Sequence, residues 1–532
     1  MSQGAGDGKG AVGRVVLVGA GPGDPDLITL RGAKALSRAD VVLYDQLAID
    51  ELLDLAPSRA LRINVGKRGH EEPTQSQDEI NALIRSHALA GRNVVRLKGG
   101  DPLVFGRGGE EISVCAEAGI PFEIVPGVTS AIAALSYAGI PVTDRRHSAS
   151  FAVVTGHKDP SRPAEQTRWR ELGTAVDTLI ILMGMRNLPK LVTELIAGGK
   201  SPDTPAAAVM HGTLSKQKTC VSTLAELPQA VKAAGLGAPS AIVVGEVVTL
   251  RDGLSWWETQ PLFGRQVLVT RALEQSAEIS SALRTVGALP VVMPMIELCR
   301  VEDAPTREEI DRVLGAVDDF GSIVFTSSNA VRFFAEELAA HAERTGDDKG
   351  RAGGRSRLRE GTRTFCIGER TAAEALDAGF PVSVVASGRS DAEALLAQLL
   401  QSFSPGEERV LIPRSRIART TIADGLAAAG VRVDSIAFYE NRRPEVDEPA
   451  LRARFMNDEI LALTFTSPST VEHFLAALDG PSRAAAEKCI CVAIGRTTAR
   501  ALEAAGLSPH VVPPKPDVQS MVDELVEEVR RR

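Results

Sequence analysis

The chain has 532 residues, of which 44% are hydrophobic and 24% charged, and its formal net charge is −8. At about 150 residues per domain, this length predicts about three and a half domains. The composition is that of a folded globular protein and excludes a disordered or collagen-like chain. The acidic balance provides no general basic surface for nucleic acid phosphates.

The start of the chain is rich in glycine and lacks the apolar core of a signal peptide. We expect a disordered tail over residues 1–12. Apolar runs such as 242–244 and 247–250 have the length of strands and are interrupted by charge, so no segment is expected to span a bilayer. These features predict a cytoplasmic protein that binds neither membranes nor nucleic acids.

The six cysteines are too few for a disulfide framework, and none belongs to a Cys-x-x-Cys pair. Cys489 and Cys491 alternate with apolar residues in an apparent strand. This pattern favours buried, reduced thiols over metal ligands. No structural metal is expected.

Strand-like and helix-like segments alternate from the first glycine loop onward, for example at 15–19, 28–36 and 41–44. This alternation predicts an α/β architecture with largely parallel sheets. The loop itself, Gly19-Ala-Gly-Pro-Gly-Asp24, does not complete a GxGxxG pattern, and its proline and aspartate oppose pyrophosphate binding. NAD binding is therefore disfavoured.

A second glycine-rich loop, within residues 94–111, follows another strand and ends where a helix is expected. Its carboxylate, Asp101, suits ribose hydroxyls or an ammonium group. Asp101-Pro102 is also a common turn or helix-entry pair. The residues alone leave both interpretations open.

Five motifs of the first half occur in an order that resembles the uroporphyrinogen-III C-methyltransferases of the tetrapyrrole methylase family. The resemblance covers about residues 13–257. It implies two α/β lobes, at about 13–150 and 151–257, with S-adenosyl-L-methionine between them, and a homodimer formed through this half. The motifs are Gly19-Ala-Gly-Pro-Gly-Asp24, Leu97-Lys-Gly-Gly-Asp-Pro102, Val125-Pro-Gly-Val-Thr-Ser-Ala131, Gly139-Ile-Pro-Val-Thr-Asp-Arg145 and Leu182-Met-Gly184.

This resemblance also implies the residues of the site. Asp45 corresponds to the family's proton acceptor and Lys67 to its proton donor. Arg68, Arg107 and Arg145 are candidates for holding substrate carboxylates, because a guanidinium binds a carboxylate with two hydrogen bonds. The implied cofactor contacts are Pro22, Gly99, Gly100, Asp101, Val104, Thr129, Ser130, Met183 and Gly212.

Several of these residues have a purely structural alternative. Thr129 and Ser130 would equally cap the helix that follows them. Met183 could instead fill a gap in the core. Asp45 could be a turn residue and Lys67 a solvated cation.

The second half begins at about residue 260, where the composition changes, and contains an internal repeat. The shorter spacing of the last matching pair places an insertion in the first copy. This insertion, at 341–361, is rich in glycine and charge and is predicted to be a flexible surface loop. The matching pairs are 267–271 with 410–414, 325–331 with 465–471, and 367–372 with 494–499.

The paired Thr-Ser and Ile-Gly-x-x-Thr motifs, with Pro413-Arg414 and Val433-Asp-Ser-Ile-Ala-Phe-Tyr-Glu440, resemble uroporphyrinogen-III synthase over 263–532. The resemblance implies two lobes with exchanged segments. One lobe would combine 263–300 with 443–532, and the other would be 301–442. It also implies a cyclisation that needs no cofactor.

Tyr439 matches the synthase family's tyrosine and is the predicted acid, although it could be a plain core residue. Hydroxyls and backbone amides would bind the substrate's carboxylates, although each hydroxyl would equally cap a helix. These groups belong to Thr326, Ser327, Gly368, Thr371, Ser467, Gly495, Thr497 and Thr498.

Together the two halves predict a bifunctional enzyme of small-molecule tetrapyrrole substrates. It would cyclise hydroxymethylbilane to uroporphyrinogen III with inversion of ring D, then methylate two ring carbons to give precorrin-2 and S-adenosylhomocysteine, for siroheme or cobalamin biosynthesis. One alternative is a methylase of a later cobalamin precursor with a non-catalytic, tetrapyrrole-binding second half. A siroheme synthase is disfavoured, because no dehydrogenase domain is expected before Val15.

Overall fold

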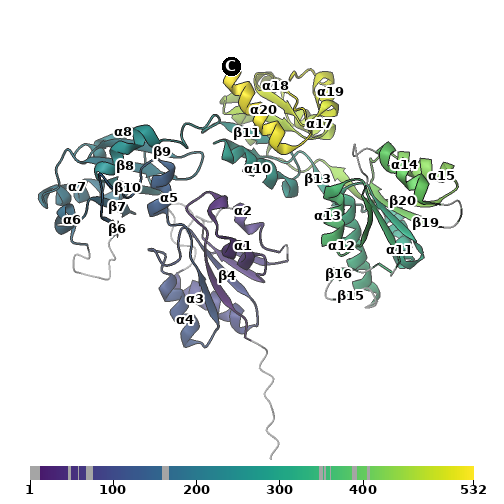
Figure 1. The fold of residues 1–532 in the computed structure, drawn as a ribbon, viewed down its shortest axis with the longest axis horizontal. Coiled ribbons are helices and arrows are strands. Elements are labelled where there is room, and N and C mark those ends of the chain that lie inside the picture. Colours follow the sequence, from purple (N-terminus) through teal and green to yellow (C-terminus); the bar gives the residue numbers. More distant parts are fainter. Residues whose placement is uncertain are drawn as a thin grey trace, which may run out of the picture.

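Four α/β lobes, two in each half of the chain, make up the computed structural model (Figure 1). Each lobe is built on its own sheet, and the predicted fold class is confirmed. The structure describes residues 12–45, 50–57, 59–66, 76–157, 167–346, 351–352, 355–356, 358–359, 361–385, 392–403, 406 and 408–532.

The first lobe has a five-stranded parallel sheet in the order β3-β2-β4-β1-β5. Val15, Leu17 and Val18 of the interior strand β1 are buried, as expected for a sheet with helices on both faces. Its strands are β1 (Val15–Gly19), β2 (Val41–Tyr44), β3 (Leu61–Asn64), β4 (Val94–Lys98) and β5 (Phe122–Val125). Its helices are α1 (Leu30–Leu36), α2 (Asp50–Leu53), α3 (Gln77–Leu89) and α4 (Gly108–Glu117), whereas the next helix, α5 (Ser130–Tyr137), packs against the sheet of the second lobe.

The second lobe has the order β6-β7-β10-β8-β9, and only β6 and β7 run parallel. The prediction of largely parallel sheets is wrong here, because β8 and β9 are joined by a short loop that permits only an antiparallel pair. Its elements are β6 (Phe151–Thr155), α6 (Trp169–Ala175), β7 (Thr178–Leu182), α7 (Leu188–Ala197), β8 (Pro205–Met210), β9 (Lys218–Thr223), α8 (Leu227–Ala233), β10 (Ser240–Val244) and α9 (Arg251–Leu254).

The third lobe joins the start of the second half to the end of the chain, in the parallel order β12-β11-β21-β22-β23. This is the exchange of segments that was predicted. Its strands are β11 (Gln266–Val269), β12 (Leu289–Val292), β21 (Ile460–Phe465), β22 (Ile490–Ala493) and β23 (Pro509–Val511). Its helices are α10 (Ser276–Thr285), α16 (Glu448–Met456), α17 (Pro468–Ala476), α18 (Gly480–Ala486), α19 (Arg496–Ala504) and α20 (Val518–Arg531).

The fourth lobe has the order β13-β20-β19-β14-β17-β18. Residues 297–300 were predicted for the other lobe, but β13 pairs antiparallel with the far end of β20. The reason is that β19 pairs with one edge of β20 and leaves the opposite edge open to β13. Its elements are β13 (Glu297–Arg300), α11 (Ala304–Gly315), β14 (Ser322–Phe325), α12 (Ser328–Thr345), β17 (Arg363–Cys366), α13 (Glu369–Asp377), β18 (Val382–Val385), α14 (Ala392–Ser402), β19 (Arg409–Ser415), α15 (Thr421–Ala428) and β20 (Arg432–Arg442).

The predicted insertion at 341–361 is partly ordered. Helix α12 continues to Thr345, and β15 (Arg351–Ala352) pairs antiparallel with β16 (Arg355–Ser356). A featureless loop is therefore wrong for these residues. The rest of the insertion, 347–350, 353–354, 357 and 360, and residues 1–11 of the predicted tail lie outside the described part of the chain.

Two further sequence expectations bear on the chain as a whole. Cys489 and Cys491 are buried, as predicted, and burial raises the pKa of both thiols, to about 11 and about 12. Within the described ranges, no three side chains of the metal-binding types are grouped to hold an ion. No helix in those ranges is long and apolar enough to cross a membrane.

Candidate active sites

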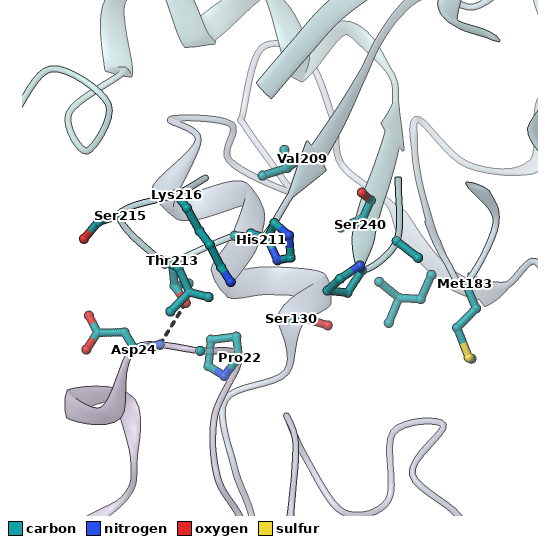
Figure 2. Close-up of a pocket in the computed structure, with 18 of the residues that line it drawn as sticks. Pro22, Asp24, Ser130, Met183, Val209, His211, Thr213, Ser215, Lys216 and Ser240 are labelled. Carbon is teal, nitrogen blue, oxygen red and sulfur yellow. Dashed lines mark hydrogen bonds between the residues drawn. The ribbon is translucent and has the colours of Figure 1, made fainter. Parts of the chain in front are cut away.

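A cavity of about 1260 Å³ lies between the first and second lobes (Figure 2). Five of the predicted cofactor contacts line it, although they are far apart in the sequence. They come from the first glycine loop, the segment after β4, the start of α5, and the loops after β7 and β8. The five are Pro22, Val104, Ser130, Met183 and Gly212.

The backbone around this cavity is strained. Among the described residues other than glycine, six have a φ in the left-handed region, and four of these line the cavity. Such a conformation costs on the order of 1–3 kcal/mol per residue and gathers at functional sites. The four are Phe105 (55°), Met183 (55°), His211 (51°) and Thr213 (72°). Phe105, His211 and Thr213 were not predicted from the sequence. The signal that could have found them is that they adjoin two predicted cofactor contacts, Val104 and Gly212.

Glycines of the motifs allow backbones to meet at the edge of the cavity. A Cβ on Gly127 would overlap the carbonyl oxygen of Gly100, and one on Gly19 would overlap Gly127. A Cβ on Gly212 would overlap the side chain of Ala134 in α5. These glycines are thus explained by close packing of the loops, which in turn shapes the cavity.

Asp101 holds two loops together. Its Oδ1 accepts a hydrogen bond from the amide of Leu103 at 2.8 Å, and its Oδ2 accepts one from the amide of Gly127 at 3.0 Å. Gly100 is bonded through its backbone to Gly21. Gly99, Gly100 and Asp101 are not among the residues that line the cavity, and their contact with a cofactor stays a prediction.

Thr129 and Ser130, at the start of α5, differ in which of the two alternative roles, helix capping or ligand contact, each can take. Thr129 caps the helix, with its hydroxyl accepting from the amide of Ala131 at 3.3 Å. Ser130 is the first helical residue and faces the cavity. Only Ser130 is therefore placed to contact a ligand there.

Asp24 joins the two lobes at the cavity. Its amide donates to Oγ1 of Thr213 at 3.0 Å, the dashed line of Figure 2. Its Oδ2 accepts from the hydroxyl of Tyr137 at 2.8 Å, and burial raises the pKa of that phenol. The ring of Tyr137 lies 4.9 Å from that of Trp256 and 5.2 Å from that of Trp257. Asp24, whose charge opposes pyrophosphate binding, thus holds the first glycine loop in place.

A buried cluster of four charges lies at the carboxyl ends of β2 and β4. Arg96, only 2% exposed, contacts Asp45 at 2.6 Å and the fully buried Glu111 at 3.1 Å. Lys98 contacts the same Oε1 of Glu111 at 3.0 Å. Burial, and then the charge of Arg96, lower the pKa of Lys98. The two cations balance the two carboxylates, and Asp45 is the half-buried member that reaches the surface.

The other predicted charged residues are placed differently. Lys67 and Arg68 lie outside the described residues. Arg107 and Arg145 are exposed and are not in the lining of the cavity. Basic groups missed in the sequence line it instead, namely His157, Arg186, His211, Lys216 and Arg284. Lys216 extends into the cavity beside His211, and burial followed by Lys216 lowers the pKa of that imidazole (Figure 2).

In the second half, Tyr439 combines its two predicted roles. It is 5% exposed, and its ring stacks on Phe333 at 4.9 Å. Its hydroxyl lies 3.0 Å from Oγ of Ser327. Burial raises the pKa of Tyr439, so the phenol is protonated at neutral pH. A protonated hydroxyl held by one partner is available as a donor.

The remaining predicted residues lie at helix N-termini that follow parallel strands. Ser327 caps α12 and Ser467 caps α17, each accepting a backbone N–H. Gly368 and Gly495 precede α13 and α19 in extended backbone. Thr371 and Thr498 are buried, Thr326 is half-buried and Thr497 is exposed. Capping is thus demonstrated for the serines, and substrate binding by any of the eight stays a prediction.

Comparison with known proteins divides the chain in the same way. The family described as Tetrapyrrole (Corrin/Porphyrin) Methylases matches residues 14–228. The family described as Uroporphyrinogen-III synthase HemD matches residues 277–523. The chain is 37% identical over 518 residues to the porphyrin biosynthesis protein HemD of Ruminiclostridium josui, covering 97% of this chain and 98% of that protein.

A further relative and a solved structure are similar to the part of the chain that includes the first half. Uroporphyrinogen-III C-methyltransferase of Bacillus subtilis (strain 168) is 42% identical over 328 residues, covering 62% of this chain and 66% of that protein. A crystal structure of uroporphyrin-III C-methyl transferase from Thermus thermophilus complexed with S-adenyl homocysteine is 39% identical, with a TM-score of 0.38. It is matched over 45% of this chain and 100% of its own.

Proposed function

The chain belongs to the tetrapyrrole methylase family through its first half and to the uroporphyrinogen-III synthase family through its second, and on this premise we propose that it makes uroporphyrinogen III and then methylates it. The chain is a bifunctional enzyme of tetrapyrrole biosynthesis. In the proposed reaction sequence, hydroxymethylbilane is cyclised with ring D inverted, and two ring carbons then receive methyl groups, giving precorrin-2.

The observation that supports methylation best is the gathering of the motif residues around one cavity. Pro22, Ser130, Met183 and Gly212 meet there from four separate segments. Ligand cavities commonly measure about 300–1,000 Å³, so a volume of about 1260 Å³ has room for S-adenosylmethionine and part of a tetrapyrrole. When bound, S-adenosylmethionine supplies an electrophilic methyl group on a sulfonium.

The residues of the chain then align the reactants and remove a proton. The apolar lining, with Leu182, Met183 and Val209, excludes water, and the fixed loops hold the reacting carbon in line with the methyl group. After transfer, the methylated pyrrole ring carries a positive charge that is shared with its nitrogen, and Asp45 accepts a pyrrole proton, which neutralises the ring. Arg96 orients the carboxylate of Asp45 from behind. Lys67 is the proposed proton donor.

The substrate is a polyanion, so the cavity must supply cations. Lys216 and Arg186 line it, and we assign them carboxylate contacts alongside the proposed Arg68, Arg107 and Arg145. Guanidinium and ammonium groups both pair with carboxylates, and the former does so with two parallel hydrogen bonds.

For cyclisation, Tyr439 is the proposed acid. Its protonated phenol donates to the hydroxyl that leaves hydroxymethylbilane, which produces an electrophilic azafulvene. The helix N-termini of α12, α13, α17 and α19 offer N–H groups and hydroxyls to the substrate's carboxylates. Folding the linear chain so that its last ring inverts and closes is a matter of placement, and no cofactor is proposed for this half.

The decisive experiment supplies the purified protein with hydroxymethylbilane and S-adenosylmethionine and identifies the products by mass and by isomer. A dimethylated type III product is expected. Without S-adenosylmethionine, uroporphyrinogen III should accumulate. Formation of type I uroporphyrinogen without methylated product would contradict the proposal, and methylation only of later cobalamin precursors would point to a methylase with a binding module. A homodimer in sedimentation and a cytoplasmic location are proposed with it.

A further inference from the structure

The wall of the methylation cavity is completed by the synthase half. Three of its residues, Arg284 of α10 and Leu289 and Pro290 of β12, line the same cavity as Pro22 and His211. Figure 1 shows α10 beside α2, where the third lobe meets the first. The cavity is therefore made by three lobes rather than two.

The connection between the halves is packed and hydrogen-bonded, which fixes α10 at the cavity. Trp257 and Leu262 are buried, and the ring of Trp257 meets that of Phe263 edge-on at 6.2 Å. The amide of Leu262 donates to Val286 at 3.0 Å, just after the end of α10. The connecting segment is thus joined directly to the helix that carries Arg284.

A second contact links the cavity loop after β8 to β12. The buried hydroxyl of Ser215 donates to the carbonyl of Ala288 at 2.7 Å. The next two residues along the chain, Leu289 and Pro290, line the cavity. The loop that carries His211 is therefore attached to the synthase half at a buried point.

Arg284 is the charged group that the synthase half brings to the cavity. Its Nη2 donates to Oε1 of Glu51, which also lines the cavity. Both side chains are partly exposed. A guanidinium carries five N–H donors in a planar fork, so the contact with Glu51 leaves donors for a ligand. Tyr44 and Asn64 line the same cavity, and Tyr44 immediately precedes Asp45, the proposed base.

We propose that Arg284, a residue of the synthase half, binds a carboxylate of the tetrapyrrole in the methylation cavity. The inference rests on the proposed function, which places a polyanionic tetrapyrrole there. Glu51 holds the guanidinium at the wall, and the substrate carboxylate takes the remaining donors. The methylation site of this fusion is incomplete without the synthase half, and binding of its substrate depends on the junction.

The test measures methylation of supplied uroporphyrinogen III by the full chain. Arg284→Ala should raise the KM for uroporphyrinogen III about ten-fold, the scale of one lost charge-assisted hydrogen bond. The KM for S-adenosylmethionine and the rate of hydroxymethylbilane cyclisation should keep their wild-type values. Arg284→Lys keeps the charge without the fork and should recover part of the loss.

Two matched variants separate direct binding from other effects. Arg530→Ala removes a cation that also pairs with a glutamate, Glu527, in the same lobe and should leave the KM unchanged. In Glu51→Gln with Arg284→Ala, the raised KM should persist. Recovery in this double variant would overturn the inference, because Arg284 would then only neutralise Glu51.

Other outcomes are equally decisive. An unchanged KM for uroporphyrinogen III in Arg284→Ala would overturn the inference. So would an equal rise in the KM for S-adenosylmethionine, since Arg284 would then serve the junction alone. A wild-type protein that does not methylate uroporphyrinogen III would instead contradict the proposed function before any variant is compared.

Discussion

The two halves place their candidate sites alike but build them from different chemistry. In both, most candidate residues lie just after the carboxyl ends of strands, although Tyr439 lies within β20 itself. The first half gathers four charges, Asp45 among them, and strained backbone at the cavity, whereas the second presents hydroxyls at helix N-termini, of which Ser327 contacts Tyr439. The difference follows the proposed steps. Taking a proton from a methylated ring requires a base, and assisting a departing hydroxyl requires a protonated donor.

Replacement of Asp45, the proposed base, should have the largest effect, a fall in the rate of methylation by the first half. Asp45→Asn keeps the shape of the side chain but removes its charge, and general-base catalysis contributes about 10²–10⁴-fold. The methylation kcat should fall by about that range, while the affinity for S-adenosylmethionine and the cyclisation rate are retained. Methylation kinetics with uroporphyrinogen III measures the fall in kcat, and calorimetry measures the affinity for S-adenosylmethionine. A kcat close to that of the wild type would remove Asp45 from the mechanism.

Disruption of the buried charge cluster tests whether the cluster stabilises the first half. Glu111→Ala leaves Arg96 and Lys98 without their shared carboxylate. Loss of one partner of a buried pair typically costs about 3–5 kcal/mol, and the free energy of unfolding of the first half should fall by that amount. All three tryptophans lie at 169, 256 and 257, so tryptophan fluorescence in urea reports this half and the junction.

The neighbouring residue supplies the control for this measurement. Glu110→Ala removes the same charge at an exposed position, where Glu110 pairs with Arg107 across one helical turn. An exposed pair contributes about 0–1 kcal/mol, so the transition should scarcely move. Equal effects of the two variants would show that the buried cluster does not stabilise the half.

Removal of one hydroxyl tests the second half. Tyr439→Phe keeps the stacking on Phe333 but loses the contact with Ser327. Cyclisation should slow by about 10²-fold, the lower end of the range for general acid catalysis, with methylation of supplied uroporphyrinogen III unchanged. An isomer-resolved assay of hydroxymethylbilane turnover measures it. If cyclisation continues at the wild-type rate, the ring is only a core residue.

The pH dependence of the same site follows from the raised pKa of Tyr439. The folded protein holds the phenolic proton above the ordinary pKa of about 10. The resulting contribution to stability is complete below that pH and is lost as the pH rises through the folded pKa. Tyr439 should therefore cause no alkaline decline in cyclisation below about pH 10. The expectation would be contradicted if the cyclisation rate of the wild-type protein fell at a lower alkaline pH and Tyr439→Phe did not show this fall.

Much of the architecture could be predicted because its signals are local. The alternation of strands and helices predicted the α/β architecture, and the resemblance of the motifs to two families implied the four lobes and the exchanged segments. The direction of the strands in the second lobe and the sheet to which β13 belongs were predicted wrongly. Both depend on which edge a strand meets after folding, and the composition of a single strand does not encode this.

The candidate site was recoverable to the extent that it lies within motifs. Pro22 and Met183 line the cavity as the motifs indicated. His211 and Thr213 were missed because their left-handed backbone is visible only in the structure. Arg284 belongs to the second half of the chain. No sequence pattern around it indicates that it lines a cavity of the first half.

The smallest predicted effect compares the two copies of the repeat within the second half. Ser327→Ala and Ser467→Ala each remove an N-cap, worth about 1 kcal/mol, so amides in the first turns of α12 and α17 should exchange hydrogen about five-fold faster. Only Ser327 also contacts Tyr439. Cyclisation should therefore slow in Ser327→Ala beyond any effect of Ser467→Ala, even though hydrogen exchange changes equally. Equal activities would mean that Ser327 serves its helix and that Tyr439 acts without this partner.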